Sequence, residues 1–231
     1  FRQCARRVIP GFELNSANLP FIIRICQVVE GMPLAIELAA AWLEAFSLAE
    51  ILDEIIKNLD FLDGEWRDLP QRQRSIRAVF NSSWIQLNDL EKTALQSLTV
   101  FRGSFSLQAF QAVCACSSRI LVMLIQKSWL RRNGDNRFAI HQLARQYASE
   151  KLAADANLLQ QVKDRHISFF TGYLDGLSEL MKGPRQREAF QAADVEFDNI
   201  QDAWQWLVER NQVGIIVRRM LLGLFLYAES N

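Results

Sequence analysis

The chain has 231 residues, of which 50% are hydrophobic and 23% are charged. A chain of this size and composition can bury a substantial core, which excludes an intrinsically disordered protein. Lys plus Arg and Asp plus Glu each number 26, so no overall field attracts the chain to nucleic acid or to an anionic membrane, and any such affinity must be local. The longest strongly apolar run covers residues 220–228, far short of the roughly 20 residues that a membrane-spanning helix needs.

The first part of the chain has apolar residues at helical spacing, and its breaks have recognisable caps. We expect a helix over residues 19–29 that ends at Gly31, the residue that best tolerates a left-handed turn. Pro33 then opens the next helix at a position where a missing N–H costs nothing. Ser47 with Glu50 forms a predicted capping box for a further helix.

The middle of the chain contains the only strong β signal that we find. Two short runs, 129–132 and 137–140, flank the turn sequence "NGDN", which predicts a hairpin. Three helices precede this hairpin, which is the element order of a winged helix. The first begins at a capping box of Asn88 with Glu91, the second at a cap at Ser106 before "LQAFQAVCA", and the third covers 119–127. Ahead of these three, a run with apolar residues at 76, 79, 80, 84 and 87 predicts one further helix.

The remainder of the chain reads as helical. A long helix follows His141, and we place a boundary near residues 155–159. The helices predicted after it have the lengths and short loops of antiparallel pairs and cover residues 158–181, 184–193, 195–210 and 213–228. We therefore expect a mainly α fold: a helical subdomain, a winged helix with a small β-hairpin, and then antiparallel helical repeat pairs.

The stretch "EGMPLAIELAAAWL" raises a question of chemistry. A Gly-x-Pro turn followed by small residues lets a flat ligand or another backbone approach closely, because Pro33 presents a rigid ring and the next side chains add little bulk. The alternative is a tight turn between two packed helices. The residues alone leave both interpretations open.

The two histidines differ in context. His141 follows the second predicted strand at the start of a helix, where its ring could donate to a phosphate beside the first-turn N–H groups. It could equally cap the helix or pack against the hairpin. His166 lies in mid-helix beside Phe169, and we interpret it as structural.

Charge clusters offer several further hypotheses. Basic residues around the hairpin could contact DNA phosphates, but the preceding helix, "RILVMLIQK", reads as buried and poor in groups able to reach a base edge. We therefore do not expect direct nucleic-acid binding. The hairpin cluster is Lys127, Arg131, Arg132, Arg137 and Arg145, and a second cluster is Arg67, Arg72, Arg74 and Arg77. Residues 188–209 contain six acidic residues and no basic ones. This stretch could be a metal or partner site, but we favour the interpretation that it is a solvated helix face.

Several motifs are missing from the chain. No G-x-x-x-x-G-K-[ST] occurs, so the chain has no P-loop and we expect no nucleotide hydrolysis by it alone. No G-x-S-x-G, H-E-x-x-H or G-x-G-x-x-G appears either, so we expect no catalytic residue and no metal site. The four cysteines have spacings that fit neither a C-x-x-C site nor paired zinc knuckles, so we expect reduced thiols.

Four separated motifs carry a family resemblance. "ICQVVEGMPLAIELAAAWL", "DLPQRQRSIRAVFNSSW", "LTVFRGSFS" and "RFAIHQLARQYASEKL", in this order, resemble the region after the nucleotide-binding core of bacterial STAND-class ATPases of the NB-ARC type. The resemblance covers about residues 1–155. More weakly, "EFDNIQDAWQWLVER" is similar to the start of the tetratricopeptide-type sensor array that often follows in these signalling regulators, many of them transcriptional.

The resemblance implies a domain plan and a site. The domains would be a helical subdomain over 1–64, a winged helix over 65–155 and the start of a helical repeat domain over 156–231. Family members pack the proline of the Gly-x-Pro-Leu motif against adenine, which implies nucleotide-binding roles for Gly31, Pro33 and Leu34. His141 matches the histidine of the family's Met-His-Asp motif and would contact the β-phosphate of ADP. Here Met32 replaces the usual leucine, while Ile140 and Gln142 replace the Met and Asp of that motif.

These implications give a functional hypothesis. The chain would be the regulatory segment of a cytoplasmic, nucleotide-switched ATPase, closing over ADP or ATP and coupling nucleotide state to domain rearrangement. It would not be an enzyme by itself. Since the chain begins without Met and ends inside a helical pattern, we expect an upstream P-loop domain in the same polypeptide to supply Mg²⁺ and hydrolysis. Its helical repeats would receive a protein or small-molecule signal, with no membrane involved. The alternatives are a DNA-binding winged-helix regulator and a protein-interaction scaffold.

Overall fold

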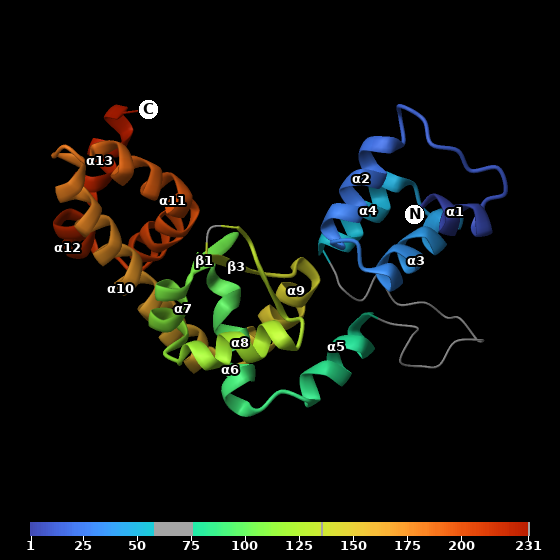
Figure 1. Cartoon of the computed structure of the whole chain (residues 1–231), viewed down its shortest axis with the longest axis horizontal. Helices are drawn as coiled ribbons and strands as arrows, with labels where there is room; N and C mark the ends of the chain where they lie inside the picture. The colour runs from blue at the N-terminus through green and yellow to red at the C-terminus, as the bar shows by residue number, and fades with distance from the viewer. Residues whose placement is uncertain (58–75, 135, 231) are drawn as a thin grey trace. The chain divides into compact units, whose positions relative to one another are not determined.

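A computed structural model describes residues 1–57, 76–134 and 136–230 (Figure 1). Across this part the chain is mainly helical with a small antiparallel sheet, which confirms the predicted fold class. The α-helices are α1 (Arg2–Val8), α2 (Leu19–Val28), α3 (Pro33–Ala41), α4 (Leu48–Lys57), α5 (Ile76–Ile85), α6 (Asp89–Ser97), α7 (Leu107–Cys114), α8 (Ser118–Gln126), α9 (Gln142–Ala153), α10 (Ala156–Met181), α11 (Gln186–Glu209), α12 (Val213–Ile215) and α13 (Leu221–Ser230). The strands are β1 (Ser104–Ser106), β2 (Leu130–Arg132) and β3 (Arg137–Ile140). Short 3₁₀ turns are η1 (Trp42–Glu44) and η4 (Leu98–Val100), and η5 (Ile216–Met220) is a π-helical turn.

The chain forms two compact units. The first contains Phe1–Lys92 and His141–Glu150, and the second contains Thr93–Ile140 and Lys151–Asn231. The first turns of α9 therefore belong with the N-terminal helices, although more than fifty residues of sequence separate them from α5. The three domain ranges expected from the sequence stay a prediction.

The first unit begins as a small helical cluster in which α1 packs against α3, and α2 against α4. The alanine side of α3 is buried, with Ala35, Ala39 and Ala40 each inaccessible to solvent. Small side chains let neighbouring helices approach closely here, as in the second of the two interpretations that the sequence left open. At the start of α4, Ser47 N donates to Glu50 Oε2 over 2.8 Å, and this confirms that capping box.

The start of α9 is fixed to the rest of the first unit by side chains along two turns. Gln146 Nε2 donates to the carbonyl oxygen of Ile56 over 2.6 Å, near the end of α4. Tyr147 is buried, stacks on Phe80 at 5.6 Å between ring centroids, and donates its hydroxyl to Asn81 Oδ1 over 2.6 Å. These bonds fix the position of the helix that His141 precedes.

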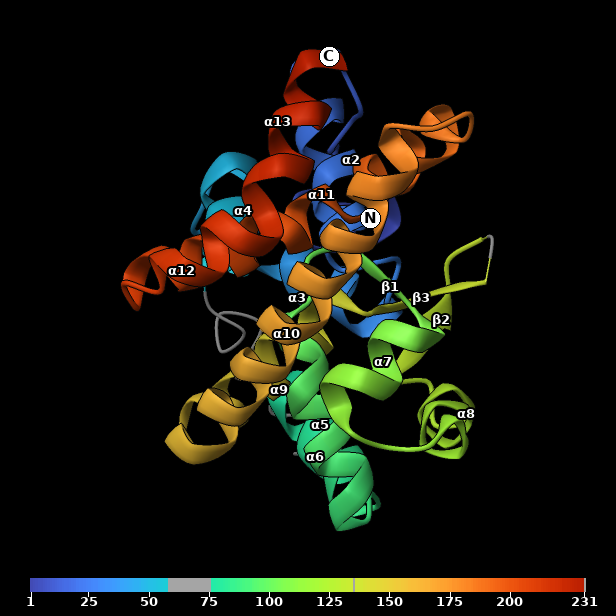
Figure 2. The same ribbon diagram turned by 90° about the vertical axis from the view of Figure 1, so that its left-hand side faces the viewer.

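The second unit contains a three-stranded antiparallel sheet in the order β1-β3-β2 (Figure 2). The predicted hairpin is present as β2 and β3, with α7 and α8 lying between β1 and β2 along the chain. With α6 ahead of it, this strand, helix, helix, hairpin order contains the three helices and the hairpin that were predicted, and it adds a strand between the first two helices. Strand β1 was not predicted, because its three residues carry too short a pattern and pair with residues about thirty positions later, Phe105 opposite Phe138.

The C-terminal helices complete the second unit. α10 packs along α11 and also contacts α7 and α13. The sequence predicted a helix break near Asp194, and this was wrong: α11 runs without interruption from Gln186 to Glu209. Instead of capping a new helix, the Asp194 carboxylate accepts a hydrogen bond from the hydroxyl of Tyr227 over 2.5 Å. The single helix predicted over 213–228 is interrupted by the π-helical turn η5.

Two further findings concern the described residues only. No single helix among them has the length and apolar composition to cross a membrane, although α7 and α8 pass that test together as a pair bent by 105°. All four cysteines are free thiols, as the sequence led us to expect.

Candidate functional site

The Gly-x-Pro turn joins α2 to α3 in the first unit. Glu30 and Gly31 both adopt left-handed backbone conformations, with φ of 48° and 73°. Gly31 N donates to the carbonyl oxygen of Cys26 over 2.9 Å, which ends α2 in the way that a glycine at this position predicts. Pro33 is the first residue of α3, and its side chain is exposed, while Leu34 is half-buried. The proline ring is therefore available to another group.

His141 caps α9. Its Nδ1 accepts a hydrogen bond from Leu143 N over 3.3 Å, so one of the two structural roles left open by the sequence is realised. Because Nδ1 accepts, a proton on the neutral ring lies on Nε2. Nε2 lies 3.9 Å from Glu30 Oε2, in a place where the side chains of His141 and Glu30 are 21% and 14% exposed.

Glu30 links the turn to the histidine. Its Oε1 accepts from Gln142 N over 3.1 Å, so a carboxylate occupies the N-terminus of α9, where negative charge is favoured. Gly31 and His141, 110 positions apart, thus come together in one unit through the residue that precedes the glycine. The N–H groups that we expected to face a phosphate are bonded here to Glu30 and to His141 itself.

Sequence reasoning missed Glu30. It stands directly before the Gly-x-Pro turn and was read only as part of that turn. The available signal was a carboxylate next to a left-handed glycine. Finding the role of Glu30 also required knowing that α9 returns to the N-terminal helices, which no local pattern encodes.

In the winged helix, α8 differs from its prediction. We expected a buried helix, and this is right for one face of α8 but wrong for the other. Ile120, Leu121 and Leu124 are buried, whereas Arg119, Val122 and Gln126 form an exposed face, Val122 being 50% exposed. Because these three positions lie three and four residues apart, they share one side of the helix. That face carries two polar groups able to reach a partner.

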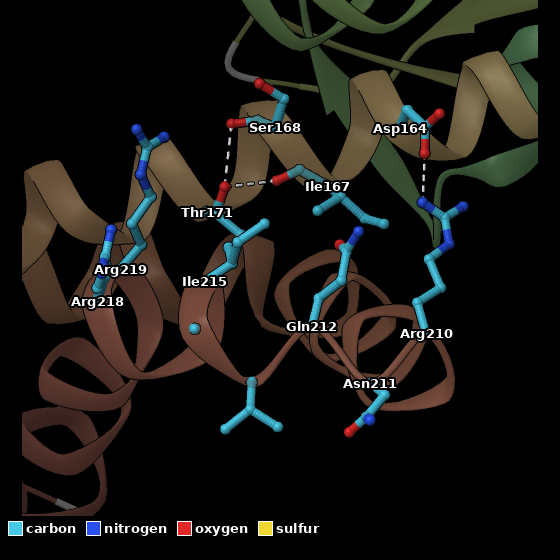
Figure 3. A pocket seen from close by; sticks show the side chains of 12 residues that line it. Asp164, Ile167, Ser168, Thr171, Arg210, Asn211, Gln212, Ile215, Arg218 and Arg219 are labelled. Carbon is cyan, nitrogen blue, oxygen red and sulfur yellow. Dashed lines mark hydrogen bonds and ion pairs between the residues drawn. The ribbon is translucent and has the colours of Figure 1, made fainter.

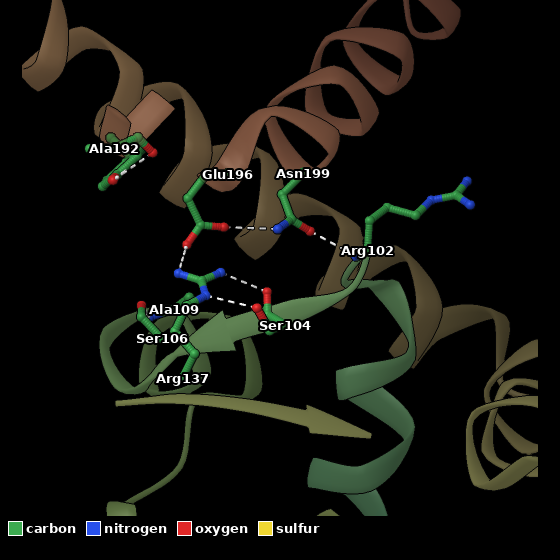
Figure 4. Close-up of polar contacts among 9 residues, drawn as sticks. Arg102, Ser104, Ser106, Ala109, Arg137, Ala192, Glu196 and Asn199 are labelled. Carbon is green, nitrogen blue, oxygen red and sulfur yellow. Dashed lines mark hydrogen bonds and ion pairs between the residues drawn. The ribbon is translucent and has the colours of Figure 1, made fainter. Parts of the chain in front are cut away.

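The hairpin arginines also separate into two kinds. Arg131 and Arg132 on β2 are exposed. Arg137 on β3 points inward, with its Nη1 2.6 Å from Glu196 Oε1 and the two side chains 17% and 5% exposed (Figure 4). Its Nε and Nη2 donate to the hydroxyl and carbonyl oxygens of Ser104 over 2.8 and 2.7 Å. Arg137 is thus satisfied inside the protein and is not part of an outward basic surface.

The Arg137–Glu196 pair belongs to a longer polar chain (Figure 4). Asn199 Nδ2 donates to Glu196 Oε2 over 2.9 Å, and Asn199 Oδ1 accepts from Arg102 N over 2.8 Å. The Arg102 side chain then bonds Asp202 over 2.8 Å. The acidic stretch of α11 was predicted to be a solvated face, which is wrong for Glu196, because this residue fixes the helix to the sheet.

The remaining site predictions can be placed briefly. His166 is completely buried among aromatic rings, which confirms its structural interpretation. Among the residues that the structure describes, no group of three or more His, Cys, Asp or Glu side chains could hold a metal ion. Most of the second basic cluster, namely Arg67, Arg72 and Arg74, lies outside the described residues. Its fourth member, Arg77, forms a two-bond ion pair with Glu150 at 2.6 and 3.0 Å.

Comparison with known proteins finds relatives of this chain but assigns the chain to no family. No family model matches the chain. The chain is 31% identical over 223 residues to "Putative HTH-type transcriptional regulator Rv0890c" of Mycobacterium tuberculosis (strain ATCC 25618 / H37Rv), matching 92% of this chain and 25% of that protein. The same values hold for "Putative HTH-type transcriptional regulator Mb0914c" of Mycobacterium bovis. It is also 30% identical over 178 residues to "Uncharacterized protein Rv0894" of M. tuberculosis, over 71% of this chain and 45% of that protein.

The chain therefore spans about a quarter of the length of the regulators it matches. Their names agree with the transcriptional-regulator part of the resemblance and favour the DNA-binding alternative over an ATPase segment.

Proposed function

We propose that this chain is a regulatory segment of a bacterial transcriptional regulator, and that the junction of Glu30, Gly31, Pro33 and His141 responds to a nucleotide. The first part of the proposal is supported by 31% identity across 92% of the chain to the mycobacterial proteins named above. The second part depends on one observation: the Gly-x-Pro turn and His141 meet through Glu30.

The proposed ligand is ADP or ATP, held jointly with a P-loop domain elsewhere in the whole protein, which would supply Mg²⁺ and hydrolysis. The exposed ring of Pro33 is suited to pack against a flat base. His141 Nε2 lies on the side of the ring that faces Glu30 and could donate to a phosphate oxygen brought there.

Glu30 gives this junction two states. In the structure, its carboxylate occupies the start of α9, bonded to Gln142 N. A phosphate needs the same N–H groups and is repelled by the carboxylate, so it binds only when Glu30 moves away. Displacing Glu30 would release the turn from α9, which links nucleotide binding to a rearrangement within the unit.

The test is calorimetric titration of ADP into the whole protein and into three variants. We expect His141→Ala to weaken ADP binding at least tenfold, which corresponds to about 1.4 kcal/mol. Glu30→Gln should instead tighten it, because the amide keeps an acceptor for Gln142 N and loses the negative charge. Glu37→Gln, an exposed glutamate on α3, is the matched control and should leave affinity unchanged.

The two opposite directions make the test specific. Equal affinity in wild type, His141→Ala and Glu30→Gln would refute a nucleotide role for this junction. Weakening in both variants would mean that the contact is merely structural.

A second candidate function is direct DNA contact by the winged helix. The exposed Arg119 and Gln126 on α8, together with the exposed arginines of β2, favour it. The names of the mycobacterial relatives support the same function for a protein of this kind.

A further inference from the structure

A cavity of about 800 Å³ lies in the second unit between α10 and the segment that joins α11 to η5 (Figure 3). This volume is in the range of small-molecule sites in proteins. One wall is formed by α10, including Asp164 and Thr171, and the other carries Arg210, Arg218 and Arg219. The cavity lies in a different unit from the Glu30–His141 junction.

The charge around the cavity is positive. Three arginines and one aspartate line it, which leaves two positive charges in excess. Arg210 Nη1 bonds Asp164 Oδ1, so this pair is largely neutralised. Arg218 and Arg219 are exposed and have no ion-pair partner among the residues that the structure describes. Uncompensated guanidinium groups at a cavity wall favour an anionic occupant.

The backbone of η5 places Arg218 and Arg219 on the exposed side of this turn. Ile216 and Met220 are buried at the ends of the π-helical turn, and the three residues between them are exposed. Figure 3 shows the side chains of Arg218 and Arg219 extending together beside α10, near Thr171. π-Helical turns are rare and occur frequently at functional sites.

Arg210 supplies a further observation. Its Nη2 is buried and has no hydrogen-bond partner among the described residues, although Nη1 bonds Asp164. A buried donor without an acceptor is costly, and native structures seldom tolerate one without a reason. Because water does not reach Nη2, an oxygen-rich ligand in the cavity would supply the acceptor only after the Arg210 side chain turns toward it.

We propose that this cavity binds a small anion carrying phosphate or carboxylate groups, with Arg218 and Arg219 as its main contacts and Arg210 at its far end. Guanidinium groups bind both kinds of oxyanion through paired hydrogen bonds. The ligand would hold α10 against the α11–η5 connection and so stabilise this arrangement of the C-terminal helices. This site goes beyond the proposed function and does not depend on it.

The experiment is calorimetric titration of the chain with pyrophosphate and, separately, with citrate at low ionic strength. We expect at least one of these anions to bind, and the stronger of the two identifies the ligand class as phosphate or carboxylate. The double variant Arg218→Gln, Arg219→Gln should weaken that binding at least tenfold. Arg185→Gln, Arg187→Gln removes two exposed arginines near the start of α11 and should change affinity less than twofold.

Backbone amide shifts of the wild-type chain provide a second readout that needs no variant. On titration, shifts should concentrate in residues 164–171 and 210–219. No binding of either anion at about 10 mM, equal weakening in both double variants, or shifts centred elsewhere would each overturn the proposal. Since neither probe carries a base and the variants lie in the second unit, failure here is distinct from failure of the nucleotide proposal.

Discussion

His166 is the residue whose burial has the clearest consequence for stability. Its ring lies in the core with the rings of Phe170 and Trp206 centred 4.5 and 5.0 Å away. Burial lowers the pKa of His166 to about 3, and nearby Asn199 offsets only part of this effect. The unfolded chain has a histidine pKa of about 6.5, so it takes up a proton first as the pH falls. The stability associated with the neutral ring is complete above about pH 6.5 and is lost progressively down to about pH 3.

We expect the wild-type chain to lose about 2 kcal/mol more unfolding free energy between pH 7 and pH 5 than His166→Phe, since only the wild type has this group to protonate. Urea denaturation at both pH values measures the difference. The carboxylates are common to both proteins, so their contribution cancels. Parallel losses in the two proteins would show that His166 is not the group responsible.

At the scale of single elements, α8 decides between regulation and direct DNA contact. If its exposed face enters a major groove, Arg119→Glu should weaken binding to a labelled 30-base-pair duplex at least tenfold, because base contacts of this kind are worth about 1–3 kcal/mol. Arg187→Glu on α11 controls for net charge. Fluorescence anisotropy at two salt concentrations separates phosphate contacts, which weaken steeply with salt, from the rest. Equal losses of duplex affinity in the two variants would contradict a role for α8 in contacting base edges.

Local elements were largely predictable from the sequence, because their signals are local. The capping boxes at Ser47 and Asn88 and the cap at Ser106 all form as expected, since each needs only partners three residues away. The same applies to the hairpin, whose turn residues set its position.

Features that depend on distant partners were not predictable in this way. Strand β1 exists because it pairs with β3, and Glu196 is buried because Arg137 faces it. In the candidate site, the sequence and its resemblance named Gly31 and His141 together but missed Glu30, which connects them. Hydrophobic periodicity specifies which face of an element is buried, not which charged group it meets there.

For the whole second unit, the Arg137–Glu196 pair joins the winged-helix sheet to the C-terminal helices. Removing one partner of a buried, hydrogen-bonded ion pair typically costs about 3–5 kcal/mol, because the other charge stays buried without compensation. We therefore expect Glu196→Gln to destabilise this unit by about that amount in urea denaturation. Asp198→Asn, an exposed change on the same helix, should stay within about 0.5 kcal/mol of wild type. Similar stabilities for the two variants would mean that the sheet and α11 do not unfold together.

The left-handed backbone of Glu30 has a consequence for the directed evolution of this protein. A residue other than glycine in that conformation carries a cost of roughly 1–3 kcal/mol, and Gly or Asn would reduce it. Screening random variants for heat resistance alone would therefore enrich Gly or Asn at position 30 wherever this backbone gain exceeds the loss of the hydrogen bond from Gln142 N. Such variants would lack the carboxylate that contacts Gln142 and His141. A selection that also scores the response to ligand is therefore needed to retain Glu30.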